Sequence, residues 1–456
     1  MSRKLHPTSL PQLTRCLRTC HPRPQTRLFS CTAKKLTDGV YGELTAMRTR
    51  TPFIEAFRKQ QAGENPSLAV PTAIHERDLS PKRMEVTRVI LPLARDPWLL
   101  DRYINSSGHI RLGTIFMDLD ALAGVIAYKH TGDSVMTVTA AVDRITLKHP
   151  LSEICDLELS GQVSFATGRS SMEISIQVAK VPTEGRERSE EDVLLTCAFT
   201  MVSLDPTTKK PVAISPLITN TPEEKAMFAQ GEANYARKKS ASALTLRKQT
   251  PNDEESDLIH QIFLRQRSYH DPLSPHQKPS SALSMKSTTI HSVQIMQPQY
   301  RNRHNFMIFG GFLLKSTFEL AFTCASAISH TRPTFLSLDP SVFENPVPVG
   351  SVLYLTATVA YSDSELVEDG TLDKKSPEGS SRIQIRVDSK VRDIEHGETK
   401  PTGTFNYTFE VGRDVRIVPE TYGEYMMFLD ARRRCRLVGE SVDELVEGGV
   451  GGGVLE

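Results

Sequence analysis

Two glycine-containing segments each open a long apolar stretch, and one stretch carries a carboxylate in helical register with its glycine. Gly113 precedes Asp120 by seven positions, and Gly310 and Gly311 open the second stretch. At about 100° per residue, seven residues turn through roughly 700°, so Gly113 and Asp120 fall near one face of a helix. The N–H groups at a helix N-terminus stabilise negative charge on oxygen, and glycine lets a ligand approach that backbone. A carboxylate on the same face can act as a general base toward a ligand held there.

Both segments belong to a long internal repeat. Asp143 precedes Pro150 by seven positions and Asp339 precedes Pro346 by the same seven, an offset of 196 residues. The offset becomes 209 further along, and the 13 extra residues fall in the polar run 362–381. Solenoid repeats recur every 20 to 50 residues, so a period near 200 indicates a duplicated domain instead.

The elements that must position these residues follow one order in each copy. In the first copy an alternating strand begins near Arg83, and apolar residues at spacings of three and four predict a helix over Thr114–His130. Four runs rich in β-branched residues then predict strands at Val135–Ile145, Cys155–Phe165, Ser171–Val181 and Val193–Leu204. A sheet and a helix that each have one apolar face bury them together, so we expect an α+β fold with a curved antiparallel sheet around each long helix.

These patterns predict a first domain at 80–205, a second at 285–412 and a connector at 206–284. The connector is longer than a tether requires and contains two helix signals, from Thr221 and from Asp253, so we expect part of it to pack on the domains.

The tail, 413–456, contains a docking segment that starts at Tyr422 and a Gly-rich end that we expect to be disordered.

The first 37 residues contain no Asp or Glu but many Arg, Lys, Ser and Thr, the composition of a mitochondrial presequence. Arg27 precedes Phe29 and Ser30 as in matrix-protease sites, which predicts cleavage near Phe29 and a matrix location. The alternative is a basic tail without a targeting role.

Composition and missing motifs exclude several classes of function. Lys plus Arg is 55 against 54 for Asp plus Glu, so neither nucleic acid nor an anionic membrane is an expected partner. The apolar stretches are shorter than the roughly 20 residues that cross a bilayer, so no membrane insertion is expected. The seven cysteines lack zinc-site spacing, and the chain has no serine-hydrolase elbow, phosphate loop or dinucleotide fingerprint. We expect no metal site.

Taken together, six segments resemble the double-hotdog acyl-coenzyme A (acyl-CoA) thioesterases, most closely the mitochondrial subgroup. The resemblance covers about residues 80–430, and its segments are 111–124, 308–313, 319–321, 332–333, 345–351 and 421–424. It implies a tandem hotdog fold and hydrolysis of acyl-CoA to free fatty acid and CoA. Because CoA is part of the substrate and a product, no separate cofactor is implied. An open hotdog sheet can continue across a partner's edge strand, so we expect a homo-oligomer.

The resemblance also implies which helix supplies the catalytic carboxylate. The family places an acidic residue seven positions after the last glycine of its motif, which is Asp120 after Gly113 but Phe318 after Gly311. Glu319 lies one residue off, about 100° around the helix. Only Asp120 is in register, while Gly310 and Gly311 form the full glycine pair that Gly113, preceded by Leu112, lacks.

A second polar group is expected shortly before the paired glycines, where the family has Asn or Asp. The usual slot is Met307, which cannot serve. Asn302, His304 and Asn305 lie nearby, beside an apparent one-residue insertion, and each is a candidate. We therefore predict one working site, made from Asp120 and the 302–305 segment, and a degenerate reciprocal site.

Arg169 and Ser170 follow a turn glycine and are candidates for binding CoA phosphates. Each of these residues also has an alternative without a role in the site. For Arg169 and Ser170 it is an ordinary hairpin turn, for Asp120 a charge on a helix surface, and for Asn305 an ordinary turn residue. We expect Glu319 to be structural, and His130 and His330 to be C-terminal helix caps.

Two functions compete with hydrolysis. The substitutions at Met307 and Phe318 favour a non-catalytic acyl-CoA-binding or regulatory hotdog protein, whereas the retained Asp120 argues against it. A hotdog hydratase is a weaker alternative because no paired Asp and His stand in the hydratase arrangement.

Overall fold

The computed structural model describes residues 52–63, 77–149, 153–182, 189–241, 246, 249–275, 277–303, 306–364 and 379–447, with the side chains of 237–241 and 437–447 left out. These residues belong to one compact unit, Thr37–Glu456. The predicted presequence and the Gly-rich end lie outside the described residues. Among the described helices, none is both long enough and apolar enough to cross a membrane.

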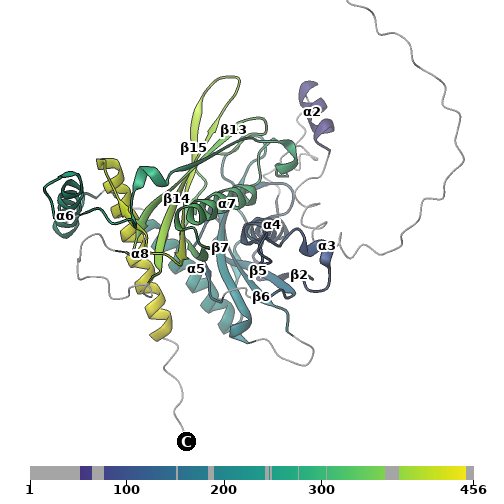
Figure 1. The fold of residues 1–456 in the computed structure, drawn as a ribbon. Coiled ribbons are helices and arrows are strands. Elements are labelled where there is room, and N and C mark those ends of the chain that lie inside the picture. The colour runs from purple at the N-terminus through teal and green to yellow at the C-terminus, as the bar shows by residue number, and fades with distance from the viewer. Residues whose placement is uncertain are drawn as a thin grey trace, which may run out of the picture. The chain divides into compact units, whose positions relative to one another are not determined.

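Two 20-residue helices, α4 (Leu112–Thr131) and α7 (Gly310–Ser329), form the centre of the fold and pack against each other (Figure 1). Both are apolar around much of their circumference, as expected for helices buried in a core. α7 ends at Ser329, and His330 follows it as a C-cap in the left-handed conformation, as predicted. The same prediction for His130 is wrong: α4 runs one residue further and ends at Gly132, and the buried His130 ring lies 2.7 Å from the carbonyl oxygen of Ser215.

Twelve strands form one antiparallel sheet around the two helices (Figure 1). The first repeat contributes β2 (Thr87–Leu91), β3 (Met136–Val142), β4 (Ile145–Leu147), β5 (Leu157–Ala166), β6 (Ser171–Lys180) and β7 (Val193–Leu204). The second contributes β10 (Ile290–Ile295), β11 (Thr334–Leu338), β12 (Ser341–Val342), β13 (Val352–Ser362), β14 (Ser381–Arg392) and β15 (Thr399–Val411). Each repeat is thus a helix wrapped by an antiparallel sheet, and the pair is a tandem hotdog fold.

The predicted strand Val135–Ile145 is two strands, β3 and β4. A bulge between Thr139 and Ala141 interrupts the register of β3 with β7, and such bulges increase the local twist. Asp143 and Arg144 then leave the ladder, and the N–H of Asp143 donates to the carbonyl of Ala198. This break lets β3 pair with β12 while β4 pairs with β11.

These two pairings join the repeats. Ile145 of β4 lies opposite Leu338 of β11, and Val142 of β3 lies opposite Ser341 of β12, both antiparallel. The sheet therefore continues from one repeat into the other. Because each repeat wraps its own helix, the continuous sheet brings α4 and α7 into contact.

Smaller elements complete the described chain. They are α2 (Phe53–Gln61), α3 (Pro97–Leu100), α5 (Pro222–Ala241), α6 (Asp253–His270), α8 (Tyr422–Glu447), β1 (Lys82–Arg83), β8 (Leu217–Ile218), β9 (Ala282–Ser284), β16 (Arg416–Val418) and the 3-10 turns Glu190–Asp192, Met285–Thr288 and Pro298–Tyr300.

The duplication extends to the helices α5 and α8. Thr221 caps α5 and Thr421 caps α8, each by accepting the N–H of a Glu three residues later. α5 packs on β5 and α8 on β13. Their aromatic contacts correspond, since Phe165 lies 4.9 Å from Phe228 and Tyr361 lies 5.1 Å from Phe428 between ring centroids. α5, within the predicted connector, is therefore the counterpart of α8 in the duplication.

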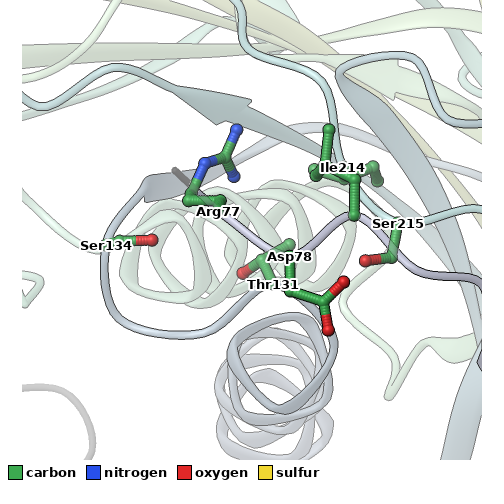
Figure 2. Close-up of a pocket in the computed structure, with 7 residues that line it drawn as sticks. Arg77, Asp78, Thr131, Ser134, Ile214 and Ser215 are labelled. Carbon is green, nitrogen blue, oxygen red and sulfur yellow. The ribbon is translucent and has the colours of Figure 1, made fainter. Parts of the chain in front are cut away.

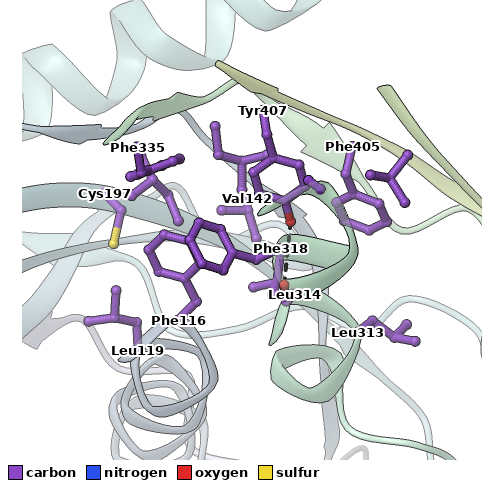
Figure 3. Close-up of a cluster of buried hydrophobic side chains, with 14 of the residues drawn as sticks. Phe116, Leu119, Val142, Cys197, Leu313, Leu314, Phe318, Phe335, Phe405 and Tyr407 are labelled. Carbon is purple, nitrogen blue, oxygen red and sulfur yellow. Dashed lines mark hydrogen bonds between the residues drawn. The ribbon is translucent and has the colours of Figure 1, made fainter. Parts of the chain in front are cut away.

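An aromatic cluster lies where the two central helices meet each other and the sheet (Figure 3). The Phe318 ring of α7 packs edge-on against Phe116, Phe335 and Tyr407, with centroid distances of 5.1, 5.4 and 5.8 Å. Such pairs add to the stabilisation from burial alone. Burial raises the pKa of Tyr407, and its neutral hydroxyl lies 2.7 Å from Thr317 Oγ1.

Candidate functional site

A carboxylate of the first repeat meets the N-terminus of the second central helix. Asp120 of α4 is fully buried, and its Oδ2 accepts the backbone N–H of Gly311 at 2.6 Å. Gly311 is the second residue of α7, so this N–H is one that the helix itself leaves unpaired. The positive end of the helix dipole favours the ionised carboxylate. A contact across 191 residues of sequence therefore joins the two repeats at one polar point.

A hydroxyl on the neighbouring strand holds the other oxygen of this carboxylate. Thr139 of β3 donates its Oγ1 hydrogen to Asp120 Oδ1 at 2.7 Å. With both oxygens hydrogen-bonded, the carboxyl group has a fixed orientation. Thr139 did not emerge from the sequence. The sequence feature that could have indicated Thr139 is its hydroxyl side chain on β3, the strand that directly follows α4.

The close approach of the two helices requires the glycine pair. A Cβ at Gly311 would stand 2.6 Å from Phe309 Cε1 and 2.7 Å from the carbonyl oxygen of Met117, closer than side chains tolerate. A Cβ at Gly310 would stand 3.1 Å from Asp120 Oδ2. Glycine at both positions therefore lets the start of α7 reach the carboxylate on α4.

The N–H of Gly310 is a second donor at this helix end. No acceptor bonds it within the described part of the chain, and Gly310 lines the adjoining cavity. A donor of this kind can hold an oxygen on which negative charge develops. The site thus combines a fixed carboxylate with an available N–H at a helix N-terminus.

The cavity beside this point has a volume of about 600 Å³, within the range of small-molecule sites. Both repeats line it, mostly with apolar side chains. The lining comprises Asp120, Ala121, Gly124, Val125, Tyr128, Met136–Ala140, Met201, Val202, Leu204, Lys209, Asn302, Arg303, Met307–Gly310, Leu313 and Phe343–Val347.

The structure distributes the other predicted site residues as follows. Asn302 lines the cavity, and so does Met307, the residue in the slot where the family has a polar group. His304 and Asn305 lie outside the described residues. Arg169 and Ser170 stand on the turn between β5 and β6 and do not line the cavity. The Ser170 carbonyl accepts the N–H of Ser203 at 2.8 Å, and the next residue, Leu204, does line the cavity.

The reciprocal position, where α7 would supply the carboxylate to the start of α4, is filled by side chains. A Cβ at Gly113 would stand 3.3 Å from Phe318 Cδ1 and 3.4 Å from Glu319 Cγ. The Glu319 carboxylate instead receives the guanidinium of Arg111, the N-cap residue of α4, at 2.6 Å. Glu319 is therefore engaged in an ion pair, its structural role stays a prediction, and the ring of Phe318 belongs to the aromatic cluster of Figure 3.

A second, smaller cavity of about 140 Å³ lies at the opposite end of α4 (Figure 2). Arg77 and Asp78 line it together with Thr131, Ser134 and Ser215. The Arg77 guanidinium donates to the Ala213 carbonyl, and Asp78 accepts from Ser80, so both charged groups have partners. None of the predicted site residues lines this cavity.

Relatives of known name share most of the chain. Human "Acyl-coenzyme A thioesterase 9, mitochondrial" is 34% identical over 369 residues, 78% of each chain. Mouse "Acyl-coenzyme A thioesterase 10, mitochondrial" is 33% identical over 366 residues, again 78% of each chain. "Acyl-coenzyme A thioesterase 2, chloroplastic" of Humulus lupulus is 32% identical and covers 74% of each chain. The chain therefore belongs to the acyl-coenzyme A thioesterase family.

No family model matches the sequence. Among solved structures, a putative oleoyl thioesterase from Lactobacillus plantarum covers 73% of this chain and 96% of its own, with 10% identity and a TM-score of 0.38. An acyl-CoA hydrolase from Bacillus cereus covers 38% of this chain and all of its own, with 18% identity and a TM-score of 0.30.

Proposed function

We propose that this protein hydrolyses acyl-CoA thioesters to free fatty acid and CoA, with Asp120 as the group that activates water. The buried Asp120 carboxylate at the N-terminus of α7, on the wall of a large apolar cavity, carries this proposal. A solvent-exposed helix charge, the alternative for Asp120, has neither the burial nor the hydrogen bonds that this group has.

The proposed reaction uses one water and no other reactant. The thioester carbonyl oxygen accepts the N–H of Gly310, which stabilises the charge that forms on that oxygen. Asp120 takes a proton from water as the water oxygen bonds to the carbonyl carbon. The carbon–sulfur bond then breaks, and the proton held by Asp120 passes to the leaving sulfur. The products are a carboxylic acid and the CoA thiol.

A second polar group would orient the attacking water. Asn302, which lines the cavity, supports the prediction that the segment before the glycine pair supplies it. His304 and Asn305 remain candidates for the same role. The Arg111–Glu319 pair and Phe318 occupy the reciprocal position, which supports one working site per chain.

Location and assembly belong to the same proposal. The acid-free segment 1–37 supports import into the mitochondrial matrix with cleavage near Phe29. The outer strands β10 and β2 end the described sheet, and the exposed Val293 and Ile295 on β10 support a homo-oligomer through the sheet edges.

Thiol release from acyl-CoA of several chain lengths tests the activity, with Asp120→Asn beside the wild type. Asparagine keeps the shape of the side chain but cannot take a proton. We expect kcat to fall by about 10²-fold or more, the contribution of a positioned general base. Thermal unfolding serves as the folding control.

Two results would overturn parts of the proposal. If the wild type releases thiol from no chain length but binds acyl-CoA, the protein is the non-catalytic binding protein that competes with this function. If Asp120→Asn retains full activity, hydrolysis occurs without this carboxylate.

A further inference from the structure

Two cations lie at one end of the cavity that holds Asp120. Arg303 and Lys209 both line this cavity, and both lie near the C-terminal end of α4. The Arg303 guanidinium stands 4.2 Å from the centre of the Tyr128 ring, and Lys209 Nζ lies 3.5 Å from Met136 Sδ. This end of an otherwise apolar cavity therefore carries two cationic side chains, of which Arg303 is paired with Asp133.

Strand β3 provides an axis along which the parts of the cavity can be ordered. Met136, beside Lys209, begins the strand, and Thr139, which holds Asp120, is three residues further. The next residue, Ala140, accepts the N–H of Phe343. Asp120 therefore stands between a cationic end and an end formed by Phe343.

The end at Phe343 has the opposite character. Leu313, Phe343 and Val347 line it with apolar surface, and the exposed Glu344 is an acidic residue there. Phosphate groups would be repelled by Glu344, whereas an alkyl chain would be favoured by the apolar side chains.

The separation between Asp120 and the cations fits one part of the substrate. Asp120, Ala121, Gly124, Val125 and Tyr128 line the cavity along one face of α4, and the eight residues from Asp120 to Tyr128 rise by about 12 Å. The pantetheine arm between thioester sulfur and pyrophosphate has the chain atoms of roughly four extended residues, about 14 Å. A thioester at Asp120 would therefore place its first phosphates near Tyr128.

Arg303 is held in a form suited to phosphate. Its side chain is 13% exposed, and it pairs with Asp133 at 2.5 Å while it lies over Tyr128. The Tyr128 hydroxyl is fixed in turn by the backbone of Thr137. A guanidinium stacked on a fixed ring is oriented before an anion arrives, and Nη2 of this one already donates to Asp133.

We propose that Arg303 and Lys209 bind the phosphate groups of CoA, that the pantetheine arm lies along α4, and that the acyl chain points toward Phe343. This assignment rests on the proposed thioesterase function. It assigns phosphate binding to Lys209, which the sequence did not indicate, and to Arg303, which lies in the predicted 302–305 segment but was not itself a candidate. The predicted Arg169–Ser170 turn adjoins Ser203 of β7, near this same end.

The test compares each acyl-CoA with the acyl-pantetheine thioester of the same acyl group, which lacks phosphates. We expect Arg303→Gln and Lys209→Gln to raise KM for acyl-CoA, by about tenfold for the arginine, because a charge-assisted phosphate contact is lost. Neither variant should change KM for acyl-pantetheine, and the rise should be equal for short and long acyl chains.

Arg416→Gln is the matched control, since Arg416 is also a partly exposed arginine in an ion pair, with Asp414, and does not line the cavity. It should leave both substrates unaffected. If Arg303→Gln fails to fold, Lys209→Gln still decides the matter, because Lys209 is exposed.

An equal rise in KM for acyl-pantetheine, or a rise that grows with acyl length, would overturn the assignment. Calorimetric titration with CoA and with pantetheine separates this failure from failure of the proposed function. A protein that hydrolyses nothing but binds CoA more tightly than pantetheine, with the difference lost in Arg303→Gln, keeps the phosphate assignment. Equal affinity of the wild type for CoA and pantetheine excludes it.

Discussion

Arg111 and Glu319 form an ion pair of 2.6 Å at the place that corresponds to the candidate site by the symmetry of the repeat. At the candidate site a carboxylate of α4, Asp120, accepts a backbone N–H at the start of α7. In the reciprocal arrangement the carboxylate of α7 receives a side chain from the start of α4. The duplicated helices therefore meet through two different polar contacts, and only one of them borders the large cavity.

Glu319→Gln should leave thioester hydrolysis nearly unchanged. The pair is partly exposed, with 41% of the Arg111 side chain and 37% of the Glu319 side chain accessible, so its loss should cost less than about 1 kcal/mol of unfolding free energy. Steady-state kinetics and urea unfolding would measure both effects. A fall in kcat comparable to that of Asp120→Asn would show that the second carboxylate takes part in the reaction.

Phe318→Ala should mainly reduce stability. The ring is only 6% exposed and packs against five other aromatic side chains, so its removal should cost about 3–5 kcal/mol. Urea unfolding measures this loss, and kcat per folded molecule should stay within about twofold, since the ring does not line the cavity. Phe318→Leu is the milder companion. A variant of unchanged stability would contradict the packing role.

Thr139→Val should lower kcat because Asp120 loses the hydroxyl that orients one of its oxygens. Valine keeps the β-branched shape that the strand favours, so the fold should persist. We expect about a tenfold loss, the scale of one neutral hydrogen bond, and recovery in Thr139→Ser. The test measures kcat of Thr139→Val and Thr139→Ser, with thermal unfolding to confirm that the two variants are equally stable. Equal activity in both variants would show that the hydroxyl has no positioning role.

The free energy of unfolding should decrease as pH is lowered, because His130 becomes protonated. Burial lowers the pKa of His130 below its ordinary value of 6.5, so the folded protein holds the ring neutral, within 2.7 Å of the Ser215 carbonyl. The contribution to stability is therefore complete above about pH 6.5 and is lost as pH falls through the lowered pKa.

Thermal unfolding between pH 7.5 and pH 5 measures this effect. The melting temperature of the wild type should fall more steeply than that of His130→Gln, which keeps an N–H donor but does not titrate in this range. Parallel curves for the two proteins would assign the pH dependence to other groups.

The elements of the fold were largely predictable because they depend on local patterns. Apolar spacing indicated the helix over 114–130, and the structure extends it only to Leu112–Thr131. The strand predicted at 135–145 was misjudged because its break depends on pairing with β11 and β12 of the other repeat. No local pattern reports a partner strand that lies about 190 residues away.

The residues of the candidate site were likewise predictable only in part. Residue types and family resemblance indicated Asp120, Gly310 and Gly311, whose roles in hydrolysis stay predictions. Thr139 was not indicated, and Arg303 was not singled out within the predicted 302–305 segment, because a threonine in a strand and an arginine in a loop are ordinary until their neighbours are known. Asn302 borders the cavity, while Arg169 and Ser170 do not line it.

The sequence by itself determined the duplication, the two apolar central helices and the inequality of their glycine and carboxylate positions, because periodicity and residue identity are local properties. Only the tertiary structure decided that Asp120 meets the N–H of Gly311 while Arg111 meets Glu319. Those contacts depend on how one continuous sheet sets the two helices against each other. Spacing along a single helix carries no information about which end of the other helix a carboxylate will reach.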